Sequence, residues 1–168
     1  MRAAPAVFVA ALATGWAGWL AAAPSLAADP SSRPAAWASA VAYRAGAIIC
    51  HQQDARSLHV HGTRMPVCAR CFGLYAGGAA GALLAAAGLV AARRPPVLRL
   101  ARWRVAAVVC GVPTLAAWAG EHVAGLAVSG AARALLAIPL GAAVAAIATL
   151  WSGGASFEDT PAGSALHS

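Results

Sequence analysis

The stretch FGLYAGGAAGALLAAAGLVAA (72–92) contains no charged residue and is long enough to cross a bilayer, which takes about 20 residues of helix. Gly73, Gly77 and Gly81 recur at every fourth position within it. That spacing lines one helical face with small residues, so a neighbouring helix can approach closely. Arginines and prolines follow at positions 93–96 and end the segment. We therefore predict a transmembrane helix over 72–92 with a closely packed neighbour.

Two further apolar segments follow along the chain, and the composition agrees with a membrane location. They cover residues 105–128 and 134–151, and 61% of the 168 residues are hydrophobic while only 10% are charged. A soluble domain of this size has too little interior to hide so much apolar surface. The predicted fold class is an all-α integral membrane protein, a bundle of three or four transmembrane helices with a three-helix region over residues 72–152.

The first 28 residues admit two interpretations. Residues 3–28 carry no charge, Arg2 precedes them, and Ser25-Leu26-Ala27 has the small-x-small pattern of a cleavage site. These features are typical of a cleaved signal peptide, but the apolar stretch is also long enough for a retained signal anchor. Both interpretations place the following segment, 29–71, outside the cytoplasm. Within that segment we expect a short interfacial helix with Trp37 and Tyr43 as anchors.

Arginine density predicts the topology. The segment 93–104 carries five arginines, whereas the five arginines of 29–71 are spread over a much longer stretch. The denser segment should be cytoplasmic, which places 29–71 outside, the C-terminus inside and the protein in a bacterial cytoplasmic membrane. The polar tail over 153–168 should be disordered. The formal charge is +7, and the arginines are spread along the loops without a basic-aromatic groove motif. We therefore expect the lipid bilayer as partner and no nucleic acid. No protein partner or oligomer is identifiable.

The chemistry is concentrated in CHQQDARSLHVHGTRMPVCARC (50–71). Thiolates spaced as C-x-x-C can reach one metal ion, and zinc takes four such ligands, with thiolate and imidazole both suitable. We predict a zinc site formed by Cys50, His51, Cys68 and Cys71. His59 and His61 are possible additional ligands.

Other interpretations of the same cysteines stay open. Cys68 and Cys71 directly precede the helix 72–92, where its N-terminus and Arg70 would favour a thiolate. The pair is therefore also a candidate for thiol–disulfide exchange. Alternatively, the segment docks a partner as part of an assembly or scaffold subunit, or its cysteines are small apolar fillers. Cys110, inside an apolar segment, is expected to be an inert thiol.

The motif resembles the signature of the prokaryotic membrane protein family known as domain of unknown function 2085. The resembling elements are Cys50-His51-Gln52, Arg56-Ser57, Gly62, the run Pro66-Val67-Cys68-Ala69-Arg70-Cys71, and then Gly73, Tyr75 and Gly77. Pro113, Glu121, Arg133, Pro139 and Gly141 are similar to a weaker second half, so the resemblance covers residues 40–150. Phe72 departs from the small hydroxyl residue expected there, which affects packing beside Cys71 but removes no ligand. The resemblance implies a membrane protein and leaves its activity open.

The predicted topology brings a second group of polar residues to the cysteine side. Glu121 and His122 lie near the far end of the third segment, and Arg133 opens the fourth. Ionisable residues this close to hydrocarbon are candidates for function. We predict one cluster of the Cys/His segment with Glu121, His122 and Arg133, in which Glu121 is the candidate catalytic base. The alternative is that Glu121 and Arg133 simply pair and tie two helices together.

Overall fold

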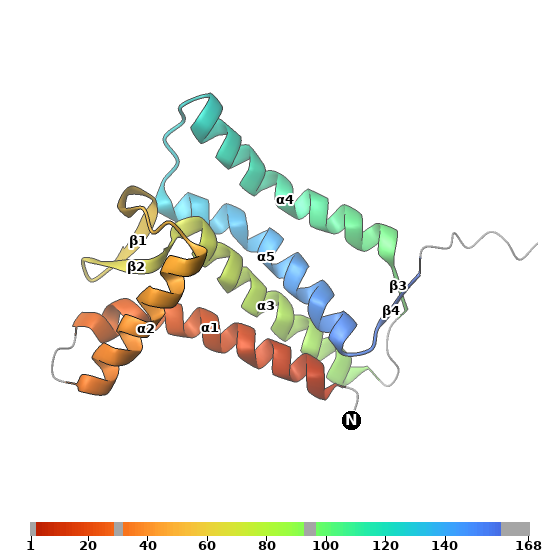
Figure 1. Ribbon diagram of the computed structural model, residues 1–168. Coiled ribbons are helices and arrows are strands. Elements are labelled where there is room, and N and C mark those ends of the chain that lie inside the picture. Colours follow the sequence, from red (N-terminus) through yellow and green to blue (C-terminus); the bar gives the residue numbers. More distant parts are fainter. Residues whose placement is uncertain (1–2, 29–31, 93–96, 159–168) are drawn as a thin grey trace, which may run out of the picture.

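Four long helices dominate the computed structural model (Figure 1), which describes residues 3–28, 32–92 and 97–158. The elements in chain order are α1 (Ala4–Ala28), α2 (Arg33–Ile49), the 3-10 turn η1 (Asp54–Arg56), β1 (Ser57–Val60), β2 (Thr63–Cys68), α3 (Ala69–Ala91), β3 (Val97–Arg99), α4 (Leu100–Val123), α5 (Gly130–Ser152) and β4 (Ser156–Glu158). Within this part of the chain, α1, α3, α5 and the Arg102–Val123 part of α4 are long and apolar enough to cross a membrane. The predicted all-α membrane fold is confirmed.

The four long helices lie side by side, with α4 on the outside beyond α5 (Figure 1). One end of the bundle contains the C-terminal ends of α1 and α4 and the N-terminal ends of α3 and α5. The helix α2 and the β1–β2 hairpin cover that end. At the opposite end, β3 pairs in parallel with β4. The chain thus returns repeatedly to one end, where the cysteine-bearing segment lies.

The closest contact in the bundle is between α3 and α5, and it depends on glycine. A Cβ atom added to a glycine of this contact would lie less than 3.0 Å from backbone of the facing helix: Gly73 faces Ala134, Gly77 faces Ile138, Gly81 faces Ala142 and, from the other side, Gly141 faces Leu74. Only glycine permits such an approach without displacement of the backbone. The predicted close packing of the small-residue face is confirmed, and its partner is α5.

The helix α1 joins this pair on the side away from α4. Its Ala6 and Ala10 are buried in a cluster with residues of α3. Further along, the ring of Trp16 lies edge-on to Tyr75, with the ring centroids 6.0 Å apart. Ser39 of α2 donates a hydrogen bond to the Ala23 carbonyl at 2.9 Å. The first helix is therefore packed against both the bundle and α2.

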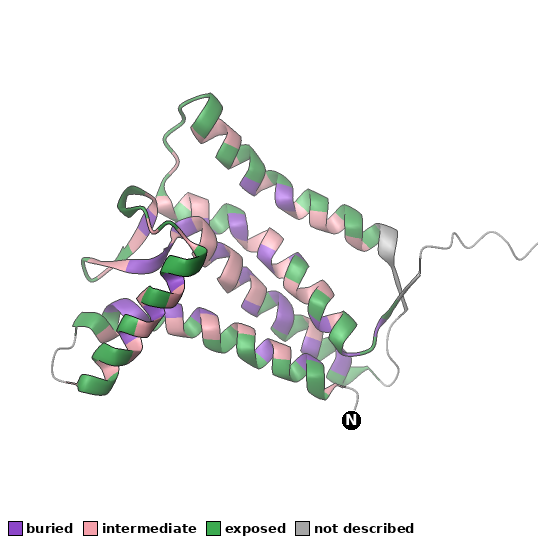
Figure 2. Cartoon of the chain, in the orientation of Figure 1, coloured by how far each residue is buried: buried purple, intermediate pink, exposed green. Residues whose placement is uncertain are grey.

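The outer surface of the bundle is apolar, as expected for contact with lipid. Exposed residues (green in Figure 2) run along all of the long helices and especially along α4. Among the exposed side chains are Val108, Val109 and Leu115 of α4, Leu84 of α3 and Trp151 of α5. A large exposed apolar surface of this kind is stable only against a nonaqueous environment. The bilayer is therefore the solvent of these helices.

Several segment ends differ from their sequence-based bounds. The helix α3 begins at Ala69 rather than at 72, so Cys71 lies inside it rather than before it, and α4 and α5 begin at Leu100 and Gly130 rather than at 105 and 134. The helix α4 ends at Val123 rather than at 128, because Gly125 adopts a left-handed backbone (φ 63) and the Leu126 N–H bonds back to the Gly120 carbonyl. The tail over 153–168 was expected to be disordered. Within it, Ser156–Glu158 form β4, which pairs with β3. The described part of the chain does not include residues 29–31, the arginines at 93–94 or residues 159–168.

Candidate metal centre

Three cysteines meet at the hairpin end of the bundle. Cys50 caps the C-terminus of α2, Cys68 is the last residue of β2, and Cys71 lies in the first turn of α3. Their sulfur atoms all lie within 4.8 Å of one another, and all three thiols are free. Tetrahedral zinc with Zn–S bonds of about 2.3 Å separates its sulfur ligands by about 3.8 Å. The three sulfurs can thus surround a metal ion with small adjustments.

The side chain of Gln52 connects α2 to β2 and so fixes the position of Cys50. Its Nε2 donates hydrogen bonds to the Tyr43 carbonyl at 2.8 Å and to the Pro66 carbonyl at 2.7 Å. The Gln52 carbonyl in turn accepts a hydrogen bond from Arg64 of β2. Gln52 adopts a positive φ of 48, a backbone conformation that costs free energy and persists only when its surroundings enforce it. The glutamine of the C-H-Q motif is therefore a structural residue.

The helix α2 lies so close to β2 that a glycine is required between them. A Cβ on Gly46 would come within 3.1 Å of the Pro66 carbonyl carbon and of Gln52 Nε2. This approach brings the Cys68 backbone N–H to 3.2 Å from Cys50 Sγ, where it donates a hydrogen bond. Such a bond stabilises a thiolate, which is the form that binds metal.

The histidine-rich part of the motif is a β-hairpin, whereas the sequence analysis described it only as a segment of 29–71. β1 and β2 pair antiparallel, with Ser57 opposite Cys68. His61 and Gly62 form the turn, with φ values of 50 and 76. Positive φ at both central residues is the requirement of a two-residue hairpin turn. The hairpin therefore places the last residue of β2, Cys68, directly at the start of α3.

The pKa of Cys68 is lowered to about 5. The main cause is a hydrogen bond from the Cys71 thiol; burial acts in the opposite direction, and the Cys71 and Arg70 backbone amides and the Cys50 thiol also contribute hydrogen bonds. Cys68 is the residue that precedes the first turn of α3, a position where backbone N–H groups favour negative charge. These hydrogen bonds therefore favour the thiolate form of Cys68.

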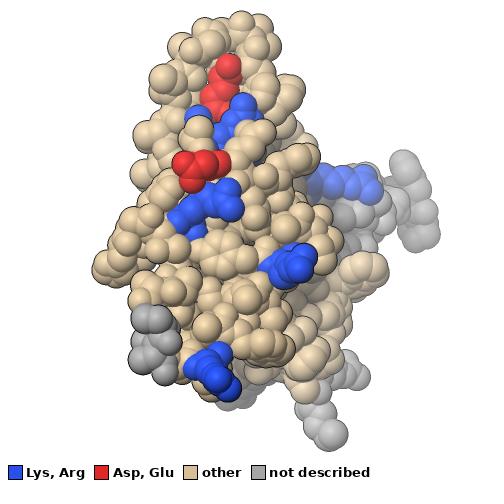
Figure 3. Space-filling model, turned by 60° about the vertical axis from the view of Figure 1, so that its left-hand side comes forward, with Lys and Arg blue, Asp and Glu red and all other residues tan. Residues whose placement is uncertain are grey.

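A cavity of about 170 Å³ opens beside the three sulfurs. Besides the cysteines, it is lined by side chains of three arginines, Arg56, Arg70 and Arg133, and by residues 49 and 51–53. Figure 3 looks onto this side of the molecule, where arginine groups (blue) adjoin acidic groups (red) on a mostly uncharged surface. The cysteine site therefore has a positively charged wall.

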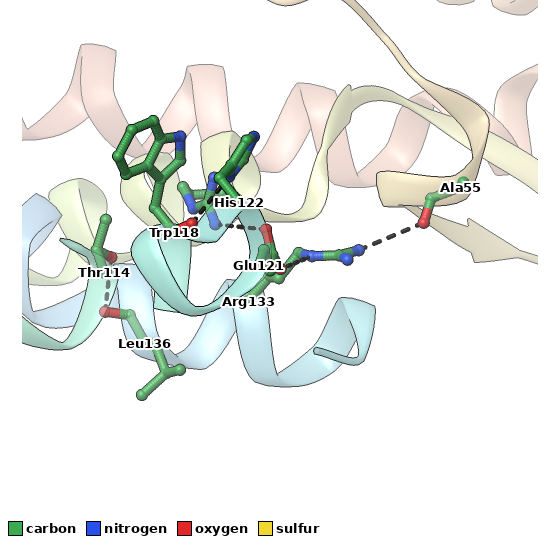
Figure 4. Close-up of polar contacts among 8 residues, drawn as sticks. Ala55, Thr114, Trp118, Glu121, His122, Arg133 and Leu136 are labelled. Atoms are coloured by element: carbon green, nitrogen blue, oxygen red, sulfur yellow. Dashed lines mark hydrogen bonds and ion pairs between the residues drawn. The ribbon is translucent and has the colours of Figure 1, made fainter. Parts of the chain in front are cut away.

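Two of these arginines share one carboxylate, that of Glu121. Arg70 Nη2 lies 3.2 Å from Glu121 Oε2, and Arg133 Nε pairs with Oε1 (Figure 4). Arg133 also donates a hydrogen bond to the Ala55 carbonyl at 3.3 Å. The Glu121 side chain is only 6% exposed. This network joins α3, α4, α5 and η1, and Arg70 is a member that the sequence analysis did not include in it.

The histidines take less central positions. His51 is exposed and lines the cavity, but its nitrogens do not belong to the group of ligand atoms within 4.8 Å. His59 lies 3.2 Å from Asp54, and His61 is exposed in the hairpin turn. His122 bonds to the Trp118 carbonyl at 2.8 Å and stacks on the Trp118 ring (Figure 4). The structure thus brings Cys50, Cys68 and Cys71 together, with His51 beside them.

Comparison with known proteins adds a family and one relative. The model of the family described as "Predicted membrane protein (DUF2085)" matches residues 50–147, from the first cysteine of the cluster into α5. An uncharacterized protein of Methanocaldococcus jannaschii, MJ1492, is 51% identical over 35 residues, which are 21% of this chain and 22% of that protein. The chain therefore covers about a fifth of this relative. No solved structure matches.

Proposed function

The chain belongs to the DUF2085 family of predicted membrane proteins, and on that premise we propose that it binds one metal ion through Cys50, Cys68 and Cys71. The observation that carries this proposal is the approach of three free thiols, from three elements, to within 4.8 Å of one another. Cysteines used only as apolar fillers have no reason to converge in this way. Zinc is the metal that we propose, because several thiolates in a tetrahedral arrangement suit it.

The fourth ligand decides what the metal can do. A fourth protein ligand closes a zinc site, whereas a water in that place leaves it open to a substrate. His51 follows Cys50 directly and lines the same cavity, so it is the protein ligand that we propose to test. Glu121, the predicted base, binds Arg70 and Arg133 through separate carboxylate oxygens. We therefore assign to Glu121 a positioning role for the two arginines rather than proton transfer.

We further propose that the site faces the extracytoplasmic side. The arginine-rich segment described over 97–104 lies at the bundle end opposite to the hairpin (Figure 1). Dense arginine in a short connection favours the cytoplasmic side. This arrangement supports the topology predicted from the sequence, with 29–71 outside.

Elemental analysis of the detergent-purified protein tests the metal proposal. We expect about one equivalent of zinc in the wild type and none in a Cys68→Ser, Cys71→Ser double variant. Cys110→Ser is the matched control, because Cys110 is also a free cysteine but lies in α4 outside the cluster; it should retain the metal. A His51→Gln variant that keeps its zinc indicates an open fourth position.

The geometry of Cys68 and Cys71 also favours a second candidate function, thiol–disulfide exchange. The two free thiols are adjacent, and Cys68 directly precedes the first turn of α3. In such an exchange the dithiol would become a disulfide while a disulfide substrate becomes two thiols. Protein that contains no metal and has Cys68 and Cys71 linked by a disulfide would refute the metal proposal and support this one. His51→Gln should not affect such an exchange.

A further inference from the structure

We propose that the cavity beside the cysteines binds an oxyanion through Arg56, next to the proposed metal ion. This inference deepens the proposed function and rests on it for the position of the metal. The ligand class is a small group with a negatively charged oxygen, of the phosphate or carboxylate kind. Three features of the site support such a ligand: the pairing of the arginines, the charge balance and the size of the cavity.

The three arginines of the cavity differ in their pairing. Arg70 and Arg133 bind Glu121. Arg56, in η1, is partly buried and lines the cavity, and its guanidinium has neither a hydrogen bond nor an ion pair with any described residue. A guanidinium that is held in a cavity wall without a partner can bind an oxyanion bidentately.

The charge balance of the loaded site also favours an anion. Three thiolates and Glu121 contribute four negative charges, whereas a divalent ion and three arginines contribute five positive ones. The site therefore has an excess of one positive charge, which favours the binding of an anion. One bound anion would neutralise it.

The size of the cavity is sufficient for such a group. A volume of about 170 Å³ corresponds to roughly five or six water molecules at about 30 Å³ each. A phosphate or carboxylate group fits into this space. One ligand oxygen can complete the metal coordination while the others bind Arg56.

Titration of the zinc-loaded protein with inorganic phosphate, followed by calorimetry, tests the inference. We expect saturable binding, weakened at least about tenfold in Arg56→Gln, which corresponds to about 1.4 kcal/mol. Arg56→Lys keeps the charge but loses the planar fork, so its affinity should lie between the two. Arg44→Gln is the matched control: Arg44 is exposed on α2 and does not line the cavity, so its removal should leave binding unchanged.

A second arm distinguishes a free anion from a lipid headgroup. The protein is reconstituted in phosphatidylcholine vesicles with or without phosphatidylglycerol, and the visible spectrum of a cobalt-substituted sample is recorded. A spectral change that requires phosphatidylglycerol and Arg56 identifies a headgroup as the ligand, whereas a change with phosphate in either membrane identifies a free anion. Equal binding by wild type and Arg56→Gln, or no response to either probe, overturns the inference. Zinc content is measured in parallel. Phosphate binding that depends on Arg56 in protein without zinc would refute the metal proposal but support the anion site.

Discussion

Replacement of Gly77 by alanine tests whether the glycine contact between α3 and α5 holds the bundle together. The new methyl carbon would lie 2.9 Å from the Ile138 Cα and nearer still to its carbonyl oxygen. Ordinary contacts of this kind begin at 3.4 Å, so the helices must separate by at least half an ångström. Overpacking of this kind costs about 1–3 kcal/mol, while the replacement of glycine by alanine within a helix recovers about 0.5–1 kcal/mol.

Gly88→Ala is the control that isolates the packing cost. Gly88 lies on the same helix, is exposed and has no atom within 4 Å of an added Cβ. Because the helix propensity gain is common to both variants, their free energies of unfolding should differ by about 1–3 kcal/mol. Equilibrium unfolding in mixed micelles, monitored by circular dichroism, measures this difference. If Gly77→Ala is as stable as Gly88→Ala, the glycines are not required for the contact and the reasoning fails.

Four other predictions concern the site and its surroundings. Glu121→Gln removes the carboxylate that two partly buried arginines share and should lower the free energy of unfolding by about 1–3 kcal/mol, whereas Asp54→Asn, in the exposed pair with a histidine, should change it by less than about 1 kcal/mol. Gln52→Ala should weaken zinc binding by about 10–100-fold, as for other residues that support ligands, and Gln53→Ala, whose side chain makes no hydrogen bond with a described residue, should not; equal zinc affinities would contradict the structural role of Gln52. An epitope inserted in the hairpin turn should be accessible to antibody in intact spheroplasts, whereas one placed directly after α5 should become accessible only after permeabilisation; the reverse pattern would invert the topology. Mass spectrometry of the mature protein should recover residues 1–28, because α1 is packed into the bundle; a cleaved chain would contradict this.

The sequence predicted the spans because apolar length and charge are local properties. The partner of the glycine face was not predictable, because Gly77 specifies a close neighbour but not which one. The hairpin was missed because His61-Gly62 is not one of the usual turn pairs such as Asn-Gly or Asp-Gly. Pro66 inside the second strand and the absence of a regular alternation obscured it further. The structural roles of Gly77 and of the hairpin residues depend on contacts with residues that are distant in the sequence.

The site was predicted in the same uneven way. The cysteine spacing indicated that Cys68 and Cys71 could share a metal ion, because two intervening residues keep their thiols close. His51 was predicted ahead of His59 and His61, and it lines the cavity, but the sequence could not show that its nitrogens lie outside the group formed by the three sulfurs. Nor could it reveal that Gln52 ties α2 to β2. Such assignments depend on the angle at which α2 crosses β2, which no local pattern encodes.

The glycine contact between α3 and α5 also limits the variation that this gene can tolerate. Every missense change in a glycine codon introduces a residue with a Cβ atom, so a single missense change at Gly73, Gly77, Gly81 or Gly141 forces the two helices apart. On the lipid face of α4, by contrast, single changes in valine or leucine codons commonly encode another apolar residue, which lipid accepts equally well. Heritable variation should therefore accumulate on the outside of α4. The residues of the contact between α3 and α5 should change little, so the relative position of Cys71 on α3 and Arg133 on α5 should be preserved.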